Sequence, residues 1–245
     1  MANSQLLSEY MTPLLRGERR TCRELIQKAI GQGFGPRDLY QAVLWPAMER
    51  VEALYREDRI NAAEEHMAFR INRTVADHLQ SRMERGPRIG RRIVITCASG
   101  EAEELSAQMC ADLFEADGWD VYFLGGGVPH DEIVSLVGSL QPHTLLIVGS
   151  KPSEAPQVRM LIDYLREISA CPEMNIMVSG GVFSRAGGLW REVKADLFAE
   201  NAAEALELAK SAEPRKPELR LPGAPKKRRR RRRPPLLAQM EEDGD

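Results

Sequence analysis

Residues 92–127 read RIVITCASGEAEELSAQMCADLFEADGWDVYFLGGG, and this stretch decides the fold. Its first six residues form a short apolar run that is typical of a buried strand. Residues 101–117 have helical character and end at Gly118. A second strand-like run, residues 119–124, ends at three successive glycines. The order strand, helix, strand predicts two parallel strands joined by a covering helix.

The same alternation continues toward the C-terminus. Strand-like runs alternate with helical stretches at 131–140, 144–149, 157–170, 175–179, 195–199 and 201–210. Strict alternation predicts a parallel sheet covered on both faces. Five strands within residues 91–210 fit the flavodoxin-like order 2-1-3-4-5, in which ligands bind at the carboxyl ends of the strands.

Residues 1–85 contain no convincing strand. Apolar residues recur at helical spacing in four stretches, which predicts a four-helix bundle. Pro36 opens the third helix, and Pro46 within it predicts a kink or a break. Gly86 and Pro87 begin a linker to the α/β domain.

The bulk composition excludes several classes of protein. With 43% hydrophobic and 29% charged residues, the chain has the balance of a soluble globular protein. No apolar run approaches the roughly 20 residues of a membrane span, and the polar N-terminus is not a secretory signal. The cysteines are far apart and without CxxC spacing, which predicts reduced thiols in a cytoplasmic protein; they are Cys22, Cys97, Cys110 and Cys171.

The loops after the strands restrict the ligand. No P-loop motif occurs, and the turn at 98–106, ASGEAEELS, lacks the GxGxxG of dinucleotide sites. Glycines instead follow the second and fourth strands, as Gly125, Gly126 and Gly127, and as Gly180 and Gly181. Either group alone is typical of a turn. Together they leave the backbone bare along one edge of the sheet, which favours a cleft for a bulky ligand.

At these residues the chain resembles a known family. A helical bundle joined to a flavodoxin-like domain is similar to the cobalamin-binding modules of methionine synthase, corrinoid methyltransferase carriers and light-sensing transcriptional regulators. The resemblance covers about residues 15–210 and is closest in LGGGVPHDEIV (124–134), VGS (148–150) and VSGGVF (178–183). It implies that these loops hold the nucleotide tail and edge of a corrin, through Gly125, Gly126, Gly127, Val128, Pro129, Ser150, Gly180, Gly181 and Phe183.

The bundle adds a second similarity. Cobalamin photoreceptors carry Trp, nine residues and Glu-His on the helices above the corrin, and here Tyr55 is followed after nine residues by Glu65 and His66. The resemblance implies that Tyr55 fills space above the ring, Glu65 accepts a ribose hydrogen bond and His66 is an axial ligand of the metal. A lone Glu-His pair on a helix is also common for structural reasons.

The chain departs from the family at the lower axial ligand. The family motif Asp/Glu-x-His-x-x-Gly corresponds here to Glu101, Glu103 in place of the histidine, and Ser106 in place of the glycine, with Leu105 between them. A carboxylate is a poorer ligand than imidazole for a borderline metal. Cobalamin would therefore be held by other contacts, and haem is the alternative cofactor on this fold.

These observations leave three functions open. The leading interpretation is a corrinoid-binding sensor or regulator, which responds to light or ligation and acts through a partner protein, such as a transcription regulator, or through nucleic acid bound by the basic tail. The alternative is a corrinoid carrier of a methyltransferase system, for which the missing histidine is a mild objection. The third is a haem-binding or ligand-free interaction module. The residues identify no catalytic group and leave both enzymatic activity and a homo-oligomer open.

Residues 211–245 predict a disordered tail, since they hold 11 basic and 6 acidic residues and are rich in proline. Eight consecutive basic residues attract nucleic acid or another polyanion without reading its sequence; they are Lys226, Lys227, Arg228, Arg229, Arg230, Arg231, Arg232 and Arg233. No aromatic residue interrupts them, which disfavours stacking on single strands.

Overall fold

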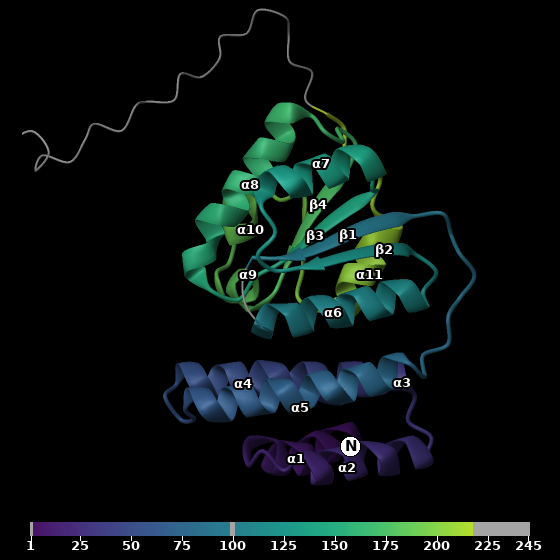
Figure 1. Ribbon diagram of the computed structural model, residues 1–245, viewed down its shortest axis with the longest axis vertical. Coiled ribbons are helices and arrows are strands. Elements are labelled where there is room, and N and C mark those ends of the chain that lie inside the picture. Colours follow the sequence, from purple (N-terminus) through teal and green to yellow (C-terminus); the bar gives the residue numbers. More distant parts are fainter. Residues whose placement is uncertain (1, 99–100, 218–245) are drawn as a thin grey trace, which may run out of the picture.

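The computed structural model describes residues 2–98 and 101–217, and these form an α/β domain preceded by helices (Figure 1). The predicted fold class is confirmed. All strand pairs of the five-stranded sheet are parallel, in the order β2-β1-β3-β4-β5. The strands are β1 (Arg92–Cys97), β2 (Asp120–Gly125), β3 (Thr144–Val148), β4 (Asn175–Ser179) and β5 (Leu197–Ala199).

Helices cover both faces of the sheet. Two helices pack together on the side of the bundle, α6 (Glu101–Ala116) and α11 (Ala202–Ser211). The opposite face is covered mainly by α7 (His130–Leu140) and α8 (Ala155–Ile168). Three short helices lie in the loops after β3 and β4: η2 (Pro152–Glu154), α9 (Gly181–Arg185) and α10 (Leu189–Glu192). Within the described ranges, no helix is long and apolar enough to cross a membrane.

The bundle helices stack in layers below α6 (Figure 1). They are α1 (Ala2–Leu15), α2 (Arg19–Gly31), α3 (Pro36–Leu39), the π-helix η1 (Tyr40–Leu44), α4 (Trp45–Arg56) and α5 (Ala62–Gln80). The helix expected from Pro36 onward does not break at Pro46. It continues through the π-helical turn. Pro46 has no N–H to donate to the preceding turn, and its ring would clash with a carbonyl of a regular α-helical turn; the wider π-helical turn before it accommodates both features.

One continuous core joins the bundle to the α/β domain. Alternate residues of the strands point to opposite faces, and Ile93 and Ile95 of β1 belong to the same core cluster as the bundle residues Tyr40 and Phe69, with α6 between them. Val94 belongs to a second core under α7 and α8. Because the bundle, α6 and the sheet all contribute side chains to the first core, the bundle packs on α6 in a defined position.

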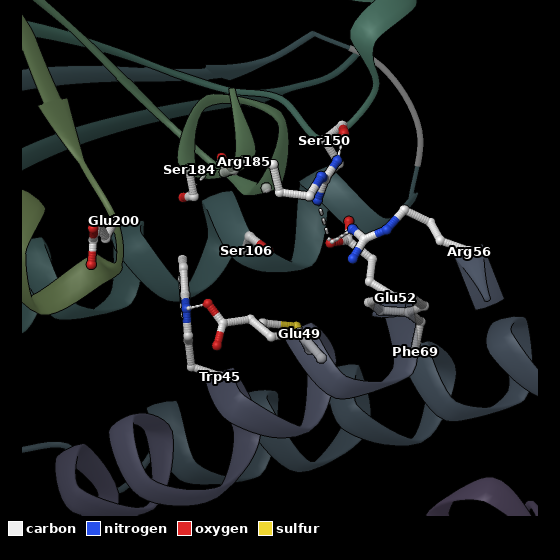
Figure 2. Close-up of a pocket in the computed structure, with 13 residues that line it drawn as sticks. Trp45, Glu49, Glu52, Arg56, Phe69, Ser106, Ser150, Ser184, Arg185 and Glu200 are labelled. Atoms are coloured by element: carbon white, nitrogen blue, oxygen red, sulfur yellow. Dashed lines mark hydrogen bonds and ion pairs between the residues drawn. The ribbon is translucent and has the colours of Figure 1, made fainter. Parts of the chain in front are cut away.

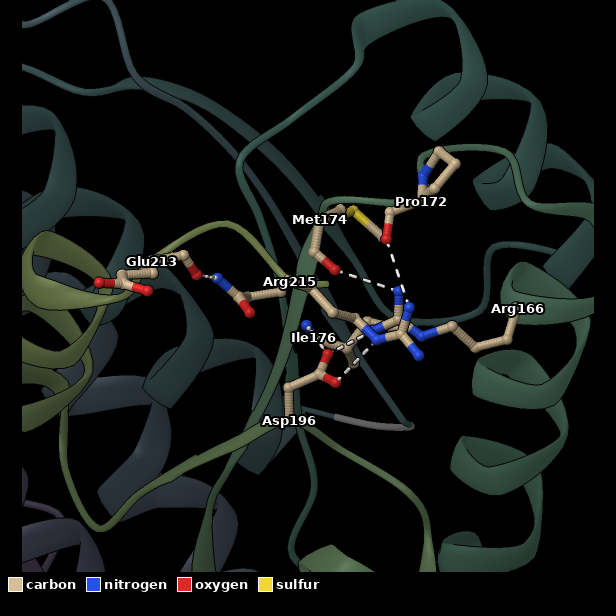
Figure 3. A network of polar contacts seen from close by, with 8 residues as sticks. Arg166, Pro172, Met174, Ile176, Asp196, Glu213 and Arg215 are labelled. Carbon is tan, nitrogen blue, oxygen red and sulfur yellow. Dashed lines mark hydrogen bonds and ion pairs between the residues drawn. The ribbon is translucent and has the colours of Figure 1, made fainter. Parts of the chain in front are cut away.

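The first part of the C-terminal segment differs from the prediction of a disordered tail over residues 211–245. Arg215 is 3.2 Å from Asp196, and its N–H donates to the carbonyl of Glu173 (Figure 3). Asn175 donates to the carbonyl of Glu213 at 2.8 Å. Residues 211–217 are therefore attached to the sheet. The basic run at 226–233 lies outside the described residues.

Candidate functional site

Three predicted loops converge at the carboxyl edge of the sheet. Thr96 at the end of β1 pairs with Gly125 of β2, and its hydroxyl donates to the Gly125 carbonyl at 3.1 Å. Val148 of β3 pairs with Ser179 of β4, and the Gly149 N–H donates to the Ser179 carbonyl at 3.0 Å. Gly126, Ser150 and Gly180 lie one or two residues beyond the ends of β2, β3 and β4, so all three loops border the same edge.

A cavity of about 160 Å³ lies between this edge and the bundle (Figure 2). The bundle contributes Trp45, Met48, Glu49, Glu52 and Arg56 of α4 and Phe69 of α5. The α/β domain contributes Ser106, Ser150, Gly180, Gly181, Ser184, Arg185 and Glu200. The spacing of three or four residues along α4 puts its members on one face of that helix.

The bundle wall combines apolar surface with carboxylates. Trp45, Met48 and Phe69 are each less than 9% exposed. The indole N–H of Trp45 donates to Glu49 at 3.1 Å. Burial raises the pKa of Glu49, with smaller increases from Glu52 and Glu200, and the bond from Trp45 opposes this rise. This wall therefore offers flat apolar contact and at least one acceptor.

The glycines at the carboxyl edge are explained in different ways, and of these Gly180 and Gly181 line the cavity whereas Gly125, Gly126 and Gly127 are not among its lining residues. Gly180 has φ +101°, and a Cβ there would stand 2.4 Å from the Gly149 carbonyl oxygen, so the loop itself requires glycine. Gly127 has φ +77° and would place its Cβ in open space. Its bare backbone is accessible, as a ligand contact requires.

Arg185 crosses the cavity and connects the two walls (Figure 2). Its guanidinium donates to the Ser150 carbonyl at 2.6 Å and lies 3.5 Å from the Glu52 carboxylate. A Cβ on Gly181 would stand 2.3 Å from the guanidinium and 2.9 Å from Glu52. The missing side chain of Gly181 therefore makes room for the Glu52–Arg185 pair, a role that the sequence prediction did not include.

Further polar contacts join α5 to the α/β domain beside the cavity. Arg73 lies 3.1 Å from Glu104, which also accepts the Gly126 N–H at 3.3 Å. Gln108 donates to Asp77 at 2.7 Å. Glu104 was not among the predicted site residues, although it directly follows the position of the family's histidine.

A buried contact lies deeper in the same interface. The Tyr40 hydroxyl is 2.8 Å from the Asp112 carboxyl and 2.9 Å from the Ala76 carbonyl. Burial raises the pKa of Asp112 to about 6, and Glu115 and Asp77 add to the rise, while Tyr40 and Arg85 oppose it. The interface between the bundle and α6 thus contains a carboxyl group, Asp112, whose pKa is raised to about 6.

The predicted cap residues Tyr55 and His66 are not among the residues that line the cavity. Tyr55 is 41% exposed, and His66 is also exposed. Glu65 is half-buried; burial raises its pKa, His66 and Lys151 lower it, and Glu52 raises it.

The helical geometry of α5 explains why His66 does not line the cavity. Residues four apart form a row on α5, and Glu65, Phe69, Arg73 and Asp77 make the row that faces the α/β domain. His66 is one position from it, about 100° around the helix.

The remaining predicted residues are divided between core and surface. Leu105 and Phe183 are 1% exposed, each inside one of the two cores, so they support the loops and do not face the cavity. Val128 packs partly on the second core, and Pro129 is exposed. The side chains of Glu101 and Glu103 lie outside the described residues. Within the described part, no three His, Cys, Asp or Glu side chains form a metal cluster.

Two family models match the chain. Residues 7–80 match one described as a B12 binding domain, and residues 91–209 match a second model with the same description. The chain belongs to the B12-binding domain family. Both the bundle and the α/β domain are covered, so the resemblance seen in the loops extends to the whole described architecture.

The relatives are corrinoid proteins. Monomethylamine corrinoid protein 1 of Methanosarcina mazei is 24% identical over 216 residues, which cover 85% of this chain and 98% of the relative. A corrinoid protein of Desulfitobacterium hafniense is 24% identical, with 83% and 95% covered. The structure of the Methanosarcina barkeri monomethylamine corrinoid protein has a TM-score of 0.73 at 20% identity, covering 84% of this chain and 98% of that one, and shows the shared fold.

These findings separate the earlier interpretations. The family supports a corrinoid, cobalamin or a close variant, as the cofactor, and gives no support to haem. The relatives also give no support to a light-responsive regulator, to a transcription-regulator partner or to nucleic acid. They favour the alternative interpretation, a corrinoid protein of a methyltransferase system.

Proposed function

We propose that this chain is a corrinoid carrier of a methyl-transfer system, with the cofactor held between the bundle and the carboxyl edge of the sheet. The observation that carries this proposal is the cavity at that edge in a chain whose two parts both match B12 binding domains. The relatives named for monomethylamine support the assignment to methyl transfer. When bound, the corrin supplies a cobalt centre that takes up and releases a methyl group.

The residues of the cavity fit the chemistry of a corrin. The macrocycle has flat apolar faces and a rim of amides, and the bundle wall offers Trp45, Met48 and Phe69 with the acceptor Glu49. The other wall contributes the backbone of Gly181 next to the Glu52–Arg185 pair, while the loop itself fills the space at Gly180. The volume of about 160 Å³ is smaller than a drug-sized pocket, so the bundle must move away from the edge before a corrin enters.

The bundle and the sheet loops have different roles in binding the cofactor. Trp45 and Phe69 would exclude water on the bundle side of a bound corrin, and the loops after β3 and β4 would hold it from the sheet side. Glu103 stands where the family has its histidine, which removes the usual imidazole below the metal. Retention therefore depends on the two walls more than on metal ligation.

The proposal is tested by incubating the purified protein with methylcobalamin or hydroxocobalamin in the dark, removing free cofactor by gel filtration and recording the absorption spectrum. A carrier should retain one corrinoid per chain and show the same oligomeric state before and after illumination. Loss of all corrin bands would reject the proposal. Retention with a light-dependent change of oligomeric state would favour the sensor instead.

Two variants test the metal ligands. Glu103→His restores the family residue and should tighten hydroxocobalamin binding, with a spectrum typical of imidazole below the metal. His66→Ala should leave the spectrum unchanged, because His66 is not among the residues that line the cavity. A changed spectrum in His66→Ala would revive the prediction that this histidine is an upper axial ligand.

A further inference from the structure

The Arg185 guanidinium is the one strongly basic group that α9 directs into the cavity (Figure 2). The other charged residues of the lining are the carboxylates Glu49, Glu52 and Glu200, together with Arg56 on the bundle. An anionic ligand entering from the sheet edge would be repelled by the carboxylates. Arg185 is the cation on the α/β wall that this anion would meet.

The contacts of Arg185 suit a residue that changes partners. Its bond to the Ser150 carbonyl, at 2.6 Å, lies within the α/β domain and fixes the guanidinium beside the loop after β3. Its contact with Glu52 crosses to the bundle and is longer, at 3.5 Å. The Glu52 side chain is 20% exposed and that of Arg185 is 35% exposed, so this second contact is reached by solvent. A shift of the bundle would therefore remove Glu52 and leave Ser150 in place.

We propose that Arg185 binds the phosphodiester of the corrinoid's nucleotide loop, and that Glu52 occupies the guanidinium until the cofactor enters. The inference rests on the proposed function. A guanidinium donates two parallel hydrogen bonds to a phosphate, and Gly181 leaves the space beside it free of a side chain. Arg185 is therefore a residue that distinguishes complete corrinoids from those without a nucleotide loop.

The test compares cobalamin with cobinamide, which has the same corrin but lacks the phosphodiester and the nucleotide. Dissociation constants are measured by absorption titration for the full-length protein and for Arg185→Gln. The variant should bind hydroxocobalamin about 10-fold to 100-fold more weakly, the worth of a charge-assisted hydrogen bond. Its affinity for cobinamide should stay the same or rise, and that retained binding also demonstrates a folded cavity.

Matched variants assign the effect. Arg56→Gln removes the other arginine near Glu52, at 3.8 Å on the same helix, and should weaken both corrinoids equally or not at all. Glu52→Gln should tighten hydroxocobalamin severalfold, since the competing carboxylate is gone. Arg185→Lys should lie between wild type and Arg185→Gln, because lysine keeps the charge and loses the bidentate geometry.

Three results would overturn the inference. Equal loss of both corrinoids in Arg185→Gln would mean that Arg185 only supports the cavity. A selective loss of cobalamin in Arg56→Gln would move the phosphate to the bundle. If the wild-type protein binds neither corrinoid, the proposed function fails together with the inference, whereas the first two results leave the proposed function intact.

Discussion

The two edges of the sheet carry ion pairs of different construction. At the amino edge, Asp196 accepts the Ile176 N–H at 2.7 Å and pairs with both Arg166 and Arg215 (Figure 3). At the carboxyl edge, Arg185 has one carboxylate partner, Glu52, and that partner belongs to the bundle. Asp196 thus accepts from three donors that all belong to the α/β domain and its C-terminal extension. Arg185, in contrast, is bound by both the α/β domain and the bundle.

This difference indicates which edge is built to open. Asp196 cannot lose its partners without unfolding of the strand end, because all of them lie on the elements around β4 and on the segment that follows α11. Glu52 would lose Arg185 if the bundle shifted as a rigid body, because the two residues lie on different parts of the molecule. A carboxyl edge that opens and an amino edge that stays closed are the properties a ligand site at the strand ends requires.

The largest effect is expected at the amino edge. Asp196→Ala leaves two partly buried guanidinium groups and one N–H without their acceptor, and should lower the free energy of unfolding by about 3 kcal/mol. Chemical denaturation measures it. Asp163→Ala is the control, because Asp163 also pairs with two cations, Arg159 and Lys194, but at a more exposed site. It should cost less than about 1 kcal/mol. Equal losses in the two variants would remove the contrast between the edges.

Much of the fold was predictable because it is encoded by local periodicity. The apolar runs at 92–97, 144–148 and 175–179 and the glycines that follow them indicate the strands and their ends, and the strand order follows from the alternation with helices. The attachment of residues 211–217 was not predictable. It depends on Arg215 meeting Asp196, residues that share no periodic pattern.

The position of the loops follows from the sequence on the sheet side of the cavity, whereas the bundle residues that face the cavity do not. Loop residues such as Ser150 and Gly180 follow strands, and a parallel sheet brings strand ends together. Which bundle residues face the cavity depends on how α4 and α5 are rotated about their own axes. The number of residues that separates Tyr55 from His66 in the sequence does not determine this rotation. Trp45 and Glu52 of α4 line the cavity where Tyr55 and His66 were expected.

An intermediate effect is expected from the buried contact between bundle and α6. The Tyr40 hydroxyl has one proton and two neighbouring acceptors, Asp112 and the Ala76 carbonyl. If Asp112 is protonated, it donates to Tyr40 and Tyr40 donates to Ala76, so both bonds form. The folded pKa of about 6 lies above the ordinary value of 3.8. The folded state therefore binds more protons between these values, and stability falls as the pH rises from about 4 to about 6.

Asp112→Asn should remove this fall, because an amide donates to Tyr40 at every pH. At pH 8 the variant should be more stable than wild type by about 1–2 kcal/mol, a value reduced for partial solvation. Thermal unfolding between pH 4 and pH 8 measures both slopes, with Asp77, Glu115 and Arg85 as the neighbouring charges that remain. Parallel slopes for the two proteins would mean that Asp112 is ionised in the folded state.

A smaller effect is expected from the partly exposed contact between Arg73 of α5 and Glu104 of α6. Arg73→Ala removes the ion pair with Glu104, in which each side chain is 32% exposed, and should cost less than about 1 kcal/mol. The cost should shrink further in 0.5 M salt, since solvent-reached pairs are screened. Arg85→Ala, which removes a more exposed pair with Glu115 at 3.2 Å, is the control and should cost less still. If Arg73→Ala lowered the free energy of unfolding about as much as Asp196→Ala, the carboxyl edge would be held by a strong ion pair, contrary to the expectation that it opens.

The smallest effect on stability is expected from removing residues 218–245. This segment is rich in arginine and proline and has little apolar surface to bury, so the free energy of unfolding should stay within about 0.5 kcal/mol of wild type. Truncation after Lys210 is the matched control. It also removes Arg215 and Glu213 from the amino edge and should cost about 1–2 kcal/mol.

The same two truncations separate the predicted polyanion contact from the fold. Both lack the run KKRRRRRR at 226–233, so any binding of double-stranded DNA by the full chain should be lost in both, and the dependence of affinity on salt should fall by about 0.9 in the logarithmic slope per lost phosphate contact. Filter binding at several salt concentrations measures it. If the protein ending at Pro217 binds DNA as well as the full chain, the basic run is not the contact. If it is as unstable as the protein ending at Lys210, residues 218–245 share in anchoring the amino edge, and the contrast with the carboxyl edge rests on more than Asp196.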